Sequence, residues 1–299
     1  MASDRKGGRA LAALVVLTLL WGYSWVIAKQ SLEYAGPFQV AFLRTATATL
    51  ALFAVLVVTR RPLRVSAPWK TACVGFFQTG VFLALSTWAL VEGGAGKTAV
   101  LIFTMPIWTL LLARMLLGER VRGVQLLAAV CALTGLVLII APWNLHASSL
   151  SKTLAVLAAM SWALGTVLIK RWRTDLSADA VTLTTWQMLF GLVLLLVVAL
   201  AVPERATDWT PAFVANIGFL ALASTALGWF LWMYVLESLP AWQASLSILG
   251  IPAVASFSSR WQLGEQVAPL ELAGMLLIAT GLLTISLLNW RAQRRLRKA

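Results

Sequence analysis

Ten separate runs of mostly apolar residues, each about as long as a bilayer-spanning helix, dominate this sequence. A transmembrane helix needs about 20 such residues, and its backbone polar groups must be hydrogen-bonded within the segment because lipid offers no partners. The runs therefore predict an all-α integral membrane protein with ten transmembrane helices and short connections. They cover residues 10–31, 37–59, 68–91, 96–117, 121–141, 150–170, 179–202, 211–236, 241–263 and 267–289.

The composition also indicates that lipid is the main solvent of the chain. Hydrophobic residues make up 60% of the 299 residues and charged residues only 12%, whereas soluble domains have roughly 45–50% and about 25%. These values exclude a soluble globular protein and a disordered chain. The two cysteines, Cys73 and Cys131, lie within apolar runs and predict neither a disulfide framework nor a metal site.

The distribution of positive charge predicts the orientation in the membrane. The formal net charge is +13, but the lysines and arginines lie in short clusters between apolar runs, which argues against a nucleic-acid partner. With the N-terminus inside, the cytoplasmic segments hold 18 of the 24 basic residues and the outer segments 5. Cytoplasmic loops of membrane proteins are enriched in lysine and arginine, so we expect both termini to be cytoplasmic.

The two halves of the sequence repeat the same pattern. Pro106 and Glu119 recur 146 residues later as Pro252 and Glu265, and the tripeptide Leu-Gly-Glu ends at both acids. Five spans per repeat is an odd number, so the second copy is expected to run with opposite polarity. Secondary transporters commonly have such inverted repeats, with the substrate site between them near the middle of the membrane. The expected boundaries are 10–141 and 150–289 for the repeats, and 1–9 and 290–299 for two basic cytoplasmic tails.

The motifs resemble those of a known family. The stretch Leu20-Trp21-Gly22-Tyr23-Ser24-Trp25-Val26-Ile27-Ala28-Lys29, with Pro37 and Phe42-Leu43-Arg44 after it, resembles the opening of the EamA domain of the drug/metabolite transporter superfamily. Pro106 through Gly135 resembles the end of that domain, and a second copy runs from Ser161-Trp162-Ala163 to Gly281. The resemblance implies a ten-helix exporter of amino acids or related metabolites. It also implies that four helices of each repeat line a central cavity while the fifth packs outside. The second copy departs from the first in having Trp186-Gln187 near the place of Leu43-Arg44.

No motif for covalent chemistry is present in the sequence. Residues 93–98, Gly-Gly-Ala-Gly-Lys-Thr, look like a phosphate-binding loop, but the pattern needs a glycine at the position of Val91 and a strand before the loop. The single histidine, His146, lies in an outer loop, and all eleven acids fall in loops, tails or near helix ends. We therefore expect no enzyme activity, no cofactor and no resident metal.

Arg44 is the exception among the charged residues because it lies about 10 Å into the second span. A charged residue at this depth usually faces a cavity or a partner, so Arg44 is a candidate contact for a substrate carboxylate. The structural alternative is that Arg44 caps backbone carbonyls or extends outward toward the membrane surface. Lys29 and Lys170 lie at span ends, where we expect them to extend toward the membrane surface.

Two prolines and two acids recur at equivalent positions of the repeats. Pro106 and Pro252 fall near the centres of the fourth and ninth spans, where proline kinks a helix, so both are candidate hinges. Glu119 and Glu265 each follow a helix-ending glycine, and we expect their charges to stabilise the N-terminus of the helix that comes next.

Tryptophan and glutamine supply the remaining candidate contacts for a substrate. Fifteen tryptophans are present, and those far from span ends are able to form a pocket for an apolar or aromatic group. Three glutamines add polar contacts. The candidate set is Arg44, Trp21, Trp25, Gln78, Trp88, Trp162, Trp186, Gln187, Trp232 and Gln243.

The sequence as a whole predicts a secondary transporter in the cytoplasmic membrane that exports small metabolites, chiefly amino acids or related carboxylates, by alternating access. A multidrug or sugar-phosphate carrier on the same fold remains an alternative, as does a membrane sensor or scaffold that transports nothing. The sequence does not distinguish a monomer from a homodimer.

Overall fold

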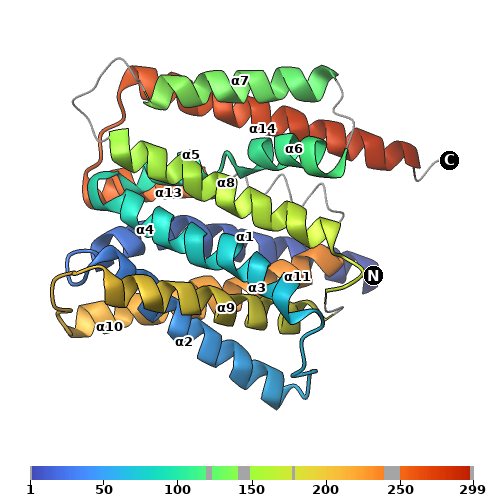
Figure 1. The fold of residues 1–299 in the computed structure, drawn as a ribbon. Helices are drawn as coiled ribbons and strands as arrows, with labels where there is room; N and C mark the ends of the chain where they lie inside the picture. Colours follow the sequence, from blue (N-terminus) through green and yellow to red (C-terminus); the bar gives the residue numbers. More distant parts are fainter. Residues whose placement is uncertain (1, 119–122, 141–148, 177–178, 239–249, 297–299) are drawn as a thin grey trace.

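The protein is a bundle of helices in a computed structural model that describes residues 2–118, 123–140, 149–176, 179–238 and 250–296. These ranges contain no β-strand, which confirms the predicted all-α class (Figure 1). The first half of the chain forms α1 (Ala2–Ser31), α2 (Pro37–Val58), α3 (Pro68–Gly75), the π-helix η1 (Phe76–Val81), α4 (Phe82–Glu92), α5 (Ala95–Ile102), α6 (Met105–Leu117) and α7 (Gly123–Ile140). The second half forms α8 (Ser149–Arg171), α9 (Ala180–Ala201), α10 (Pro211–Gly218), the π-helix η2 (Phe219–Leu227), α11 (Gly228–Ser238), α13 (Gly250–Leu263) and α14 (Pro269–Leu296).

Seven segments, each a single helix or several consecutive helical elements, are long and apolar enough to cross a membrane. They match the first four expected spans and the sixth to eighth: Ala12–Ser31, Pro37–Val58, Pro68–Glu92, Ala95–Leu117, Ser149–Arg171, Ala180–Ala201 and Pro211–Trp232. The expected runs 121–141 and 241–263 lie partly outside the described residues, and in α14 the apolar stretch is Leu272–Gly281.

The ends of the helices follow from residues with fixed backbone preferences. Proline occupies the first turn of α2, α3 and α10, where its missing N–H would have no helical partner in any case. Gly118 and Gly264 have φ angles of 68° and 66°. Only glycine adopts this left-handed conformation at little energetic cost, and both glycines end a helix as the sequence predicts.

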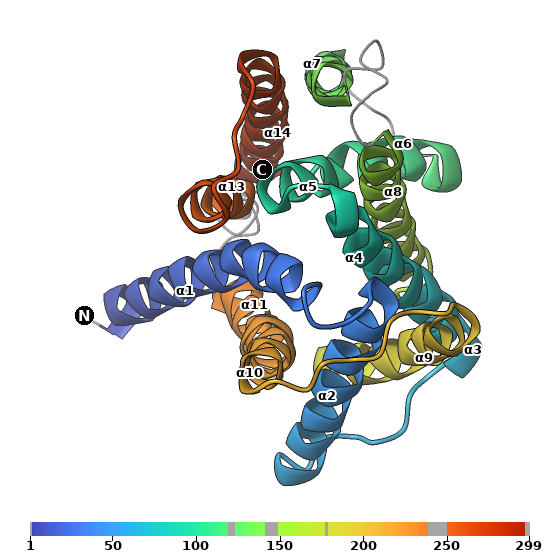
Figure 2. The same ribbon diagram turned by 90° about the vertical axis from the view of Figure 1, so that its left-hand side faces the viewer.

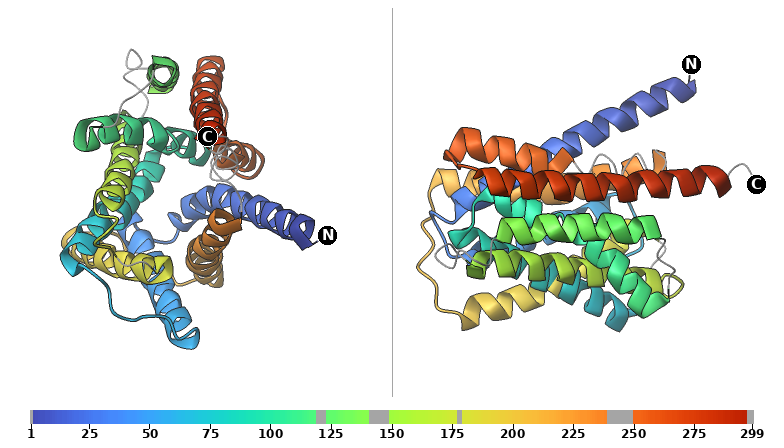
Figure 3. Two further views of the ribbon diagram at one scale, coloured as in Figure 1. Left: turned by 90° about the vertical axis from the view of Figure 1, so that its right-hand side faces the viewer. Right: turned by 90° about the horizontal axis from the view of Figure 1, so that it is seen from above.

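The two halves pack on each other reciprocally. α1 of the first half packs on α11 and α13, and α8 of the second half packs on α4 and α6, while α2 packs on α9. Figure 2 shows α7 and α14 at one edge of the bundle, and they contact each other extensively. In Figure 3 the beginning of α1 and the end of α14 lie at the same end of the bundle.

Glycines allow the two halves to approach closely around α9. A Cβ atom on Gly191 would lie 2.5 Å from the Cβ of Thr79 in η1, and one on Gly165 would lie 2.6 Å from the Cβ of Gln78. A Cβ on Gly75 would meet the backbone carbonyl of Gln187. These contacts bring the backbone of α9 and α8 directly against η1.

The fourth span is broken into two helices. α5 ends at Ile102, and α6 begins at Met105, with Pro106 in its first turn. The hydroxyl of Thr104 between them donates to the Leu101 carbonyl at 2.6 Å and accepts from the Trp108 indole at 3.1 Å. The break therefore lies directly before the proline that the sequence marks as a candidate hinge.

Candidate functional site

Two π-helical segments occupy equivalent places in the two halves of the molecule. Each begins at the phenylalanine of a Gly-Phe pair in the middle of a span, η1 at Phe76 and η2 at Phe219. π-Helical turns are rare and occur frequently at functional sites. α9 packs on η1, and α2 packs on η2, so each segment faces a helix of the opposite half.

A chain of amide hydrogen bonds joins α9 to η1. The Nε2 of Gln187 donates to the Oε1 of Gln78 at 2.9 Å and lies 3.4 Å from the Thr79 hydroxyl. The Nε2 of Gln78 donates in turn to the hydroxyl of Thr166 in α8 at 3.1 Å. Both glutamines are almost fully buried, and the structure thus brings together two of the predicted site residues. Their contact crosses from one half of the chain to the other.

Arg44 lies at the position in α2 that Gln187 has in α9, seven residues after the first residue of its helix. Its Nη2 donates to the hydroxyl of Thr225 in η2 at 3.3 Å. The Thr225 hydroxyl itself donates to the Leu220 carbonyl at 2.8 Å. The Nε of Arg44 is buried and has no hydrogen-bond partner within the described part of the chain.

Three of the predicted tryptophans form one aromatic cluster with two further rings. The Trp21 indole donates to the carbonyl of Ser224 in η2 at 2.8 Å, and its ring centroid lies 6.1 Å from that of Trp232 and 6.4 Å from that of Trp229. Trp162 lies 6.2 Å from Trp229 and 4.7 Å from Phe82, again between centroids. The cluster joins helices of both halves on the side of η2.

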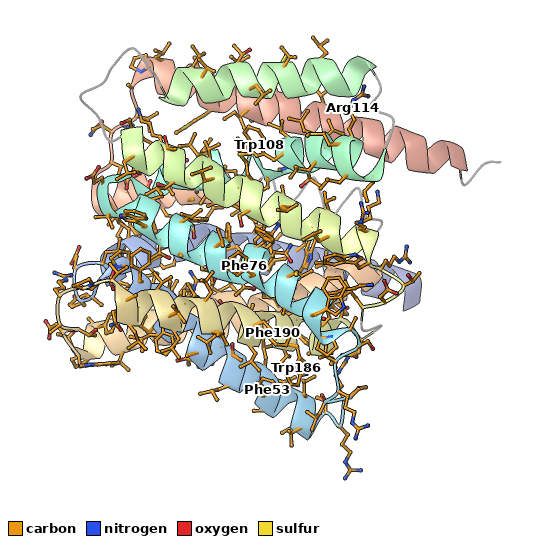
Figure 4. The ribbon with its side chains drawn as sticks, in the orientation of Figure 1. Phe53, Phe76, Trp108, Arg114, Trp186 and Phe190 are labelled. Atoms are coloured by element: carbon orange, nitrogen blue, oxygen red, sulfur yellow. The ribbon has the colours of Figure 1, made fainter. Side chains whose placement is uncertain are left out.

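The other predicted tryptophans lie elsewhere. Trp25 packs between the two largest groups of buried apolar side chains. Trp88 is 38% exposed and contacts Phe38. Trp186 donates its indole N–H to the Leu63 carbonyl at 2.8 Å and contacts Phe53 and Phe190. Figure 4 shows these last three rings together where α2 and α9 meet.

Some predicted residues lie at the edge of what the structure describes. Gln243 and Glu119 fall outside the described residues. Pro252 is the third residue of α13, and the residues immediately before that helix are also outside the described ranges. Pro106 is exposed at the start of α6. The described residues contain no group of three or more His, Cys, Asp or Glu side chains that could hold a metal ion.

Two acids bind helix N-termini of the opposite half, at the end of the bundle remote from the chain termini. Glu204, after α9, accepts hydrogen bonds from the backbone N–H groups of Phe38 and Gln39 in α2, both at 2.9 Å. Glu265, after α13, accepts from Ala95 at 2.6 Å and Gly96 at 3.2 Å in α5. The expectation that the charge of Glu265 stabilises the N-terminus of the helix following it is therefore wrong. The packing of the two halves places its carboxylate against α5 instead of α14.

Lys29 also makes a contact between helices at this end of the bundle. Its ammonium group donates to the carbonyls of Leu90 at 2.5 Å and Val91 at 3.0 Å, at the C-terminus of α4. The last carbonyls of a helix have no partner within it and carry partial negative charge. Lys29 therefore caps the C-terminus of α4, at the end of the third span.

Ion pairs join the two halves at the opposite end. Arg61 pairs with Asp179 at 2.7 Å, and Lys70 pairs with Asp175 at 2.6 Å. Asp179 is the N-cap of α9 and accepts from the Thr182 N–H at 2.7 Å. Partial burial alone would raise the pKa of Asp179, but the hydrogen bonds from Thr182 and Arg61 and the charge of Arg61 hold this pKa below its ordinary value.

Comparisons with known proteins identify the family of the chain, several relatives and a similar fold. The sequence pattern described as the EamA-like transporter family matches residues 8–141 and again residues 150–287. The "Uncharacterized transporter YoaV" of Bacillus subtilis is 29% identical, with 92% of this chain and 95% of that protein covered. The "Probable amino-acid metabolite efflux pump" of Escherichia coli is 26% identical, with coverage of 96% and 97%. The crystal structure of another protein matches with a TM-score of 0.66 at 16% identity, over 94% of this chain and 98% of that one, which shows a likeness of fold.

Proposed function

The chain belongs to the EamA-like transporter family and contains two EamA repeats, and from this premise we propose that it exports amino acids or related small carboxylates across the cytoplasmic membrane. Transport proceeds by alternating access, in which the two repeats move relative to each other around a substrate held between them. The amino-acid efflux named for the Escherichia coli relative supports this substrate class.

The observation that carries the proposal is the exchange of polar contacts between the repeats at the two π-helical segments. Gln187 reaches from the second repeat into η1, and Arg44 reaches from the first repeat into η2. A substrate bound among these side chains touches both repeats at once. Its binding energy therefore depends on how the repeats are arranged, which is the requirement for coupling a ligand to a conformational change.

The proposed orientation has ten spans in two inverted repeats with both termini in the cytoplasm. The charge distribution supports it, and so does the meeting of the first and last helices at one end of the bundle (Figure 3). In this orientation the Arg61–Asp179 and Lys70–Asp175 pairs lie at the cytoplasmic end. The Glu204 and Glu265 contacts lie at the outer end. Opening either end requires separation of contacts between the repeats.

Efflux from liposomes containing the purified protein tests the function. Liposomes are loaded with each of the common amino acids in labelled form, and efflux is compared with that from protein-free liposomes prepared in parallel. We expect faster efflux for a subset of amino acids. Efflux of cationic drugs or sugar phosphates without efflux of any amino acid would favour a carrier of those compounds. No efflux of any of these solutes would favour a membrane sensor or scaffold.

A further inference from the structure

The guanidinium of Arg44 is a charged group inside the bundle without an acidic partner. Its Nη2 makes one long hydrogen bond, 3.3 Å to the Thr225 hydroxyl, and its Nε is buried without any partner among the described residues. A guanidinium carries five N–H donors in a fixed planar arrangement. Burial of a charged donor without a partner is unfavourable, so the site as folded lacks an anion.

The acids near the relevant helices are occupied elsewhere. Glu204 binds the N-terminus of α2, about one and a half helical turns from Arg44 along the same helix. Glu265 binds α5. Asp179 and Asp175 pair with Arg61 and Lys70 at the other end of the bundle. Neither of these two ion pairs involves Arg44.

The surroundings of Arg44 also provide a place for an apolar group. Thr225, its hydrogen-bond partner, is held in η2 by the bond to Leu220. Trp229 follows Thr225 by four residues, which is about 6 Å along a helix and on the same face. The ring of Trp229 contacts Trp21 and Trp162. An anion-binding group and aromatic faces therefore lie about one helical turn apart.

Resting on the proposed function, we propose that Arg44 and Thr225 form a carboxylate-binding subsite, and that the protein selects its substrates by the carboxylate and not by the ammonium group. The planar guanidinium fits a carboxylate with two parallel hydrogen bonds, and the apolar part of the ligand lies toward Trp229. The acids Glu204, Glu265, Asp175 and Asp179 are engaged elsewhere, so none of them is placed to balance a ligand ammonium there. Carboxylates that lack the amino group therefore bind at this subsite as well.

Three compounds with the same phenyl group separate the contributions of the ligand groups. Phenylalanine has both charges, phenylalaninamide lacks the carboxylate, and 3-phenylpropionate lacks the ammonium group. Binding is measured as thermal stabilisation of the purified protein across a concentration series, which does not require transport. We expect stabilisation by phenylalanine and 3-phenylpropionate and none by phenylalaninamide or by uncharged 3-phenylpropionamide.

Variants then assign the carboxylate to Arg44. Arg44→Gln is expected to weaken 3-phenylpropionate binding by about tenfold or more, because hydrogen bonds between charged groups are the strong ones. Arg44→Lys keeps the charge but loses the planar arrangement of donors. We therefore expect it to bind 3-phenylpropionate more weakly than the wild type and more tightly than Arg44→Gln. Arg64→Gln removes an exposed positive charge from the loop after α2 and is the matched control, with unchanged binding expected.

The outcomes distinguish the subsite from the proposed function. Three results would overturn the subsite while leaving amino-acid efflux untouched. These are equal stabilisation by 3-phenylpropionate and its amide, absence of stabilisation by phenylalanine and 3-phenylpropionate, and unchanged binding in Arg44→Gln. Binding of phenylalanine but not of 3-phenylpropionate would overturn selection by the carboxylate alone. Acid-specific binding that depends on Arg44, without amino-acid efflux from liposomes, would support the subsite and overturn the exporter.

Discussion

Glu204 holds the first turn of α2 from the opposite repeat, and its replacement by glutamine tests whether this contact stabilises the fold. The two carboxylate oxygens accept from the N–H groups of Phe38 and Gln39, each at 2.9 Å. The N-cap residue is Gly36, which provides no side-chain hydrogen bond. A side chain on Gly36 would occupy the place of the carboxylate, so the cap of α2 is supplied by Glu204 alone.

The expected loss follows from the bonds that glutamine cannot make. Its amide retains one acceptor oxygen, but its NH₂ group faces a backbone donor, so one of the two hydrogen bonds is lost together with the negative charge. A hydrogen bond to a charged group contributes about 1.5–3 kcal/mol, and a charge at a helix N-terminus about 0.3–1 kcal/mol. Glu204 is partly exposed, which favours the lower values. We therefore expect Glu204→Gln to reduce the free energy of unfolding by about 2 kcal/mol.

Reversible unfolding of the purified protein by SDS in mixed micelles, followed by circular dichroism, measures this change. Asp208→Asn in the same connection is the matched control, because Asp208 is exposed and its carboxylate has no hydrogen bond among the described residues. For that control we expect a change within about 0.5 kcal/mol. If Glu204→Gln were as mild as Asp208→Asn, the reasoning that Glu204 caps α2 across the repeats would be refuted.

Three further perturbations test the hinge, the charged cap of α9 and the orientation. Pro106→Ala restores a backbone N–H donor at the break between α5 and α6, so we expect slower efflux with little change in substrate affinity. Unchanged turnover would contradict the role of Pro106 as a hinge. The lowered pKa of Asp179 predicts that the stability difference between wild type and Asp179→Asn is full above about pH 5. This difference shrinks as the pH falls below 3.8, the ordinary pKa of an aspartate, and disappears as the pH passes the lower pKa that Asp179 has in the folded protein. A melting-temperature difference that does not change with pH would contradict this reasoning. In a background without Cys73 and Cys131, an impermeant thiol reagent added outside intact cells should label Glu33→Cys but not Arg64→Cys, and the reverse pattern would overturn the orientation.

The sequence was sufficient for the all-α class and for the helix ends. Apolar runs of bilayer length predicted the helices because lipid allows few other backbone structures. Gly118 and Gly264 marked helix ends because their backbone conformation excludes most other residues. The sequence indicated Gln78 and Gln187 only as separate polar contacts for a substrate, whereas in the structure the two amides bond to each other.

The contacts between repeats could not be read from the sequence. Glu265 and its partners in α5 are about 170 residues apart, and nothing local distinguishes an acid that binds the next helix from one that binds a distant helix. Trp186 and Gln187 are neighbours in the chain, but successive residues point about 100° apart on a helix. Gln187 therefore faces η1 while Trp186 bonds to Leu63. Such directions depend on how α9 is rotated, which packing decides.

The spacing of the repeats does contain one signal of the π-helical segments. Gly75 and Gly218 are 143 residues apart, and so are the first residues of α3 and α10, whereas Pro106 and Pro252 are 146 apart. The second repeat therefore gains three residues between these landmarks, and η2 is three residues longer than η1, nine against six. Three residues added to a regular α-helix would rotate everything beyond them by about 300° and shift it by about 4.5 Å. The wider turns of η2 accommodate three more residues than those of η1 within the corresponding span. The sequence places the added residues between Gly218 and Pro252. In the structure η2, the segment that contains Thr225, is longer than η1 by the same number of residues.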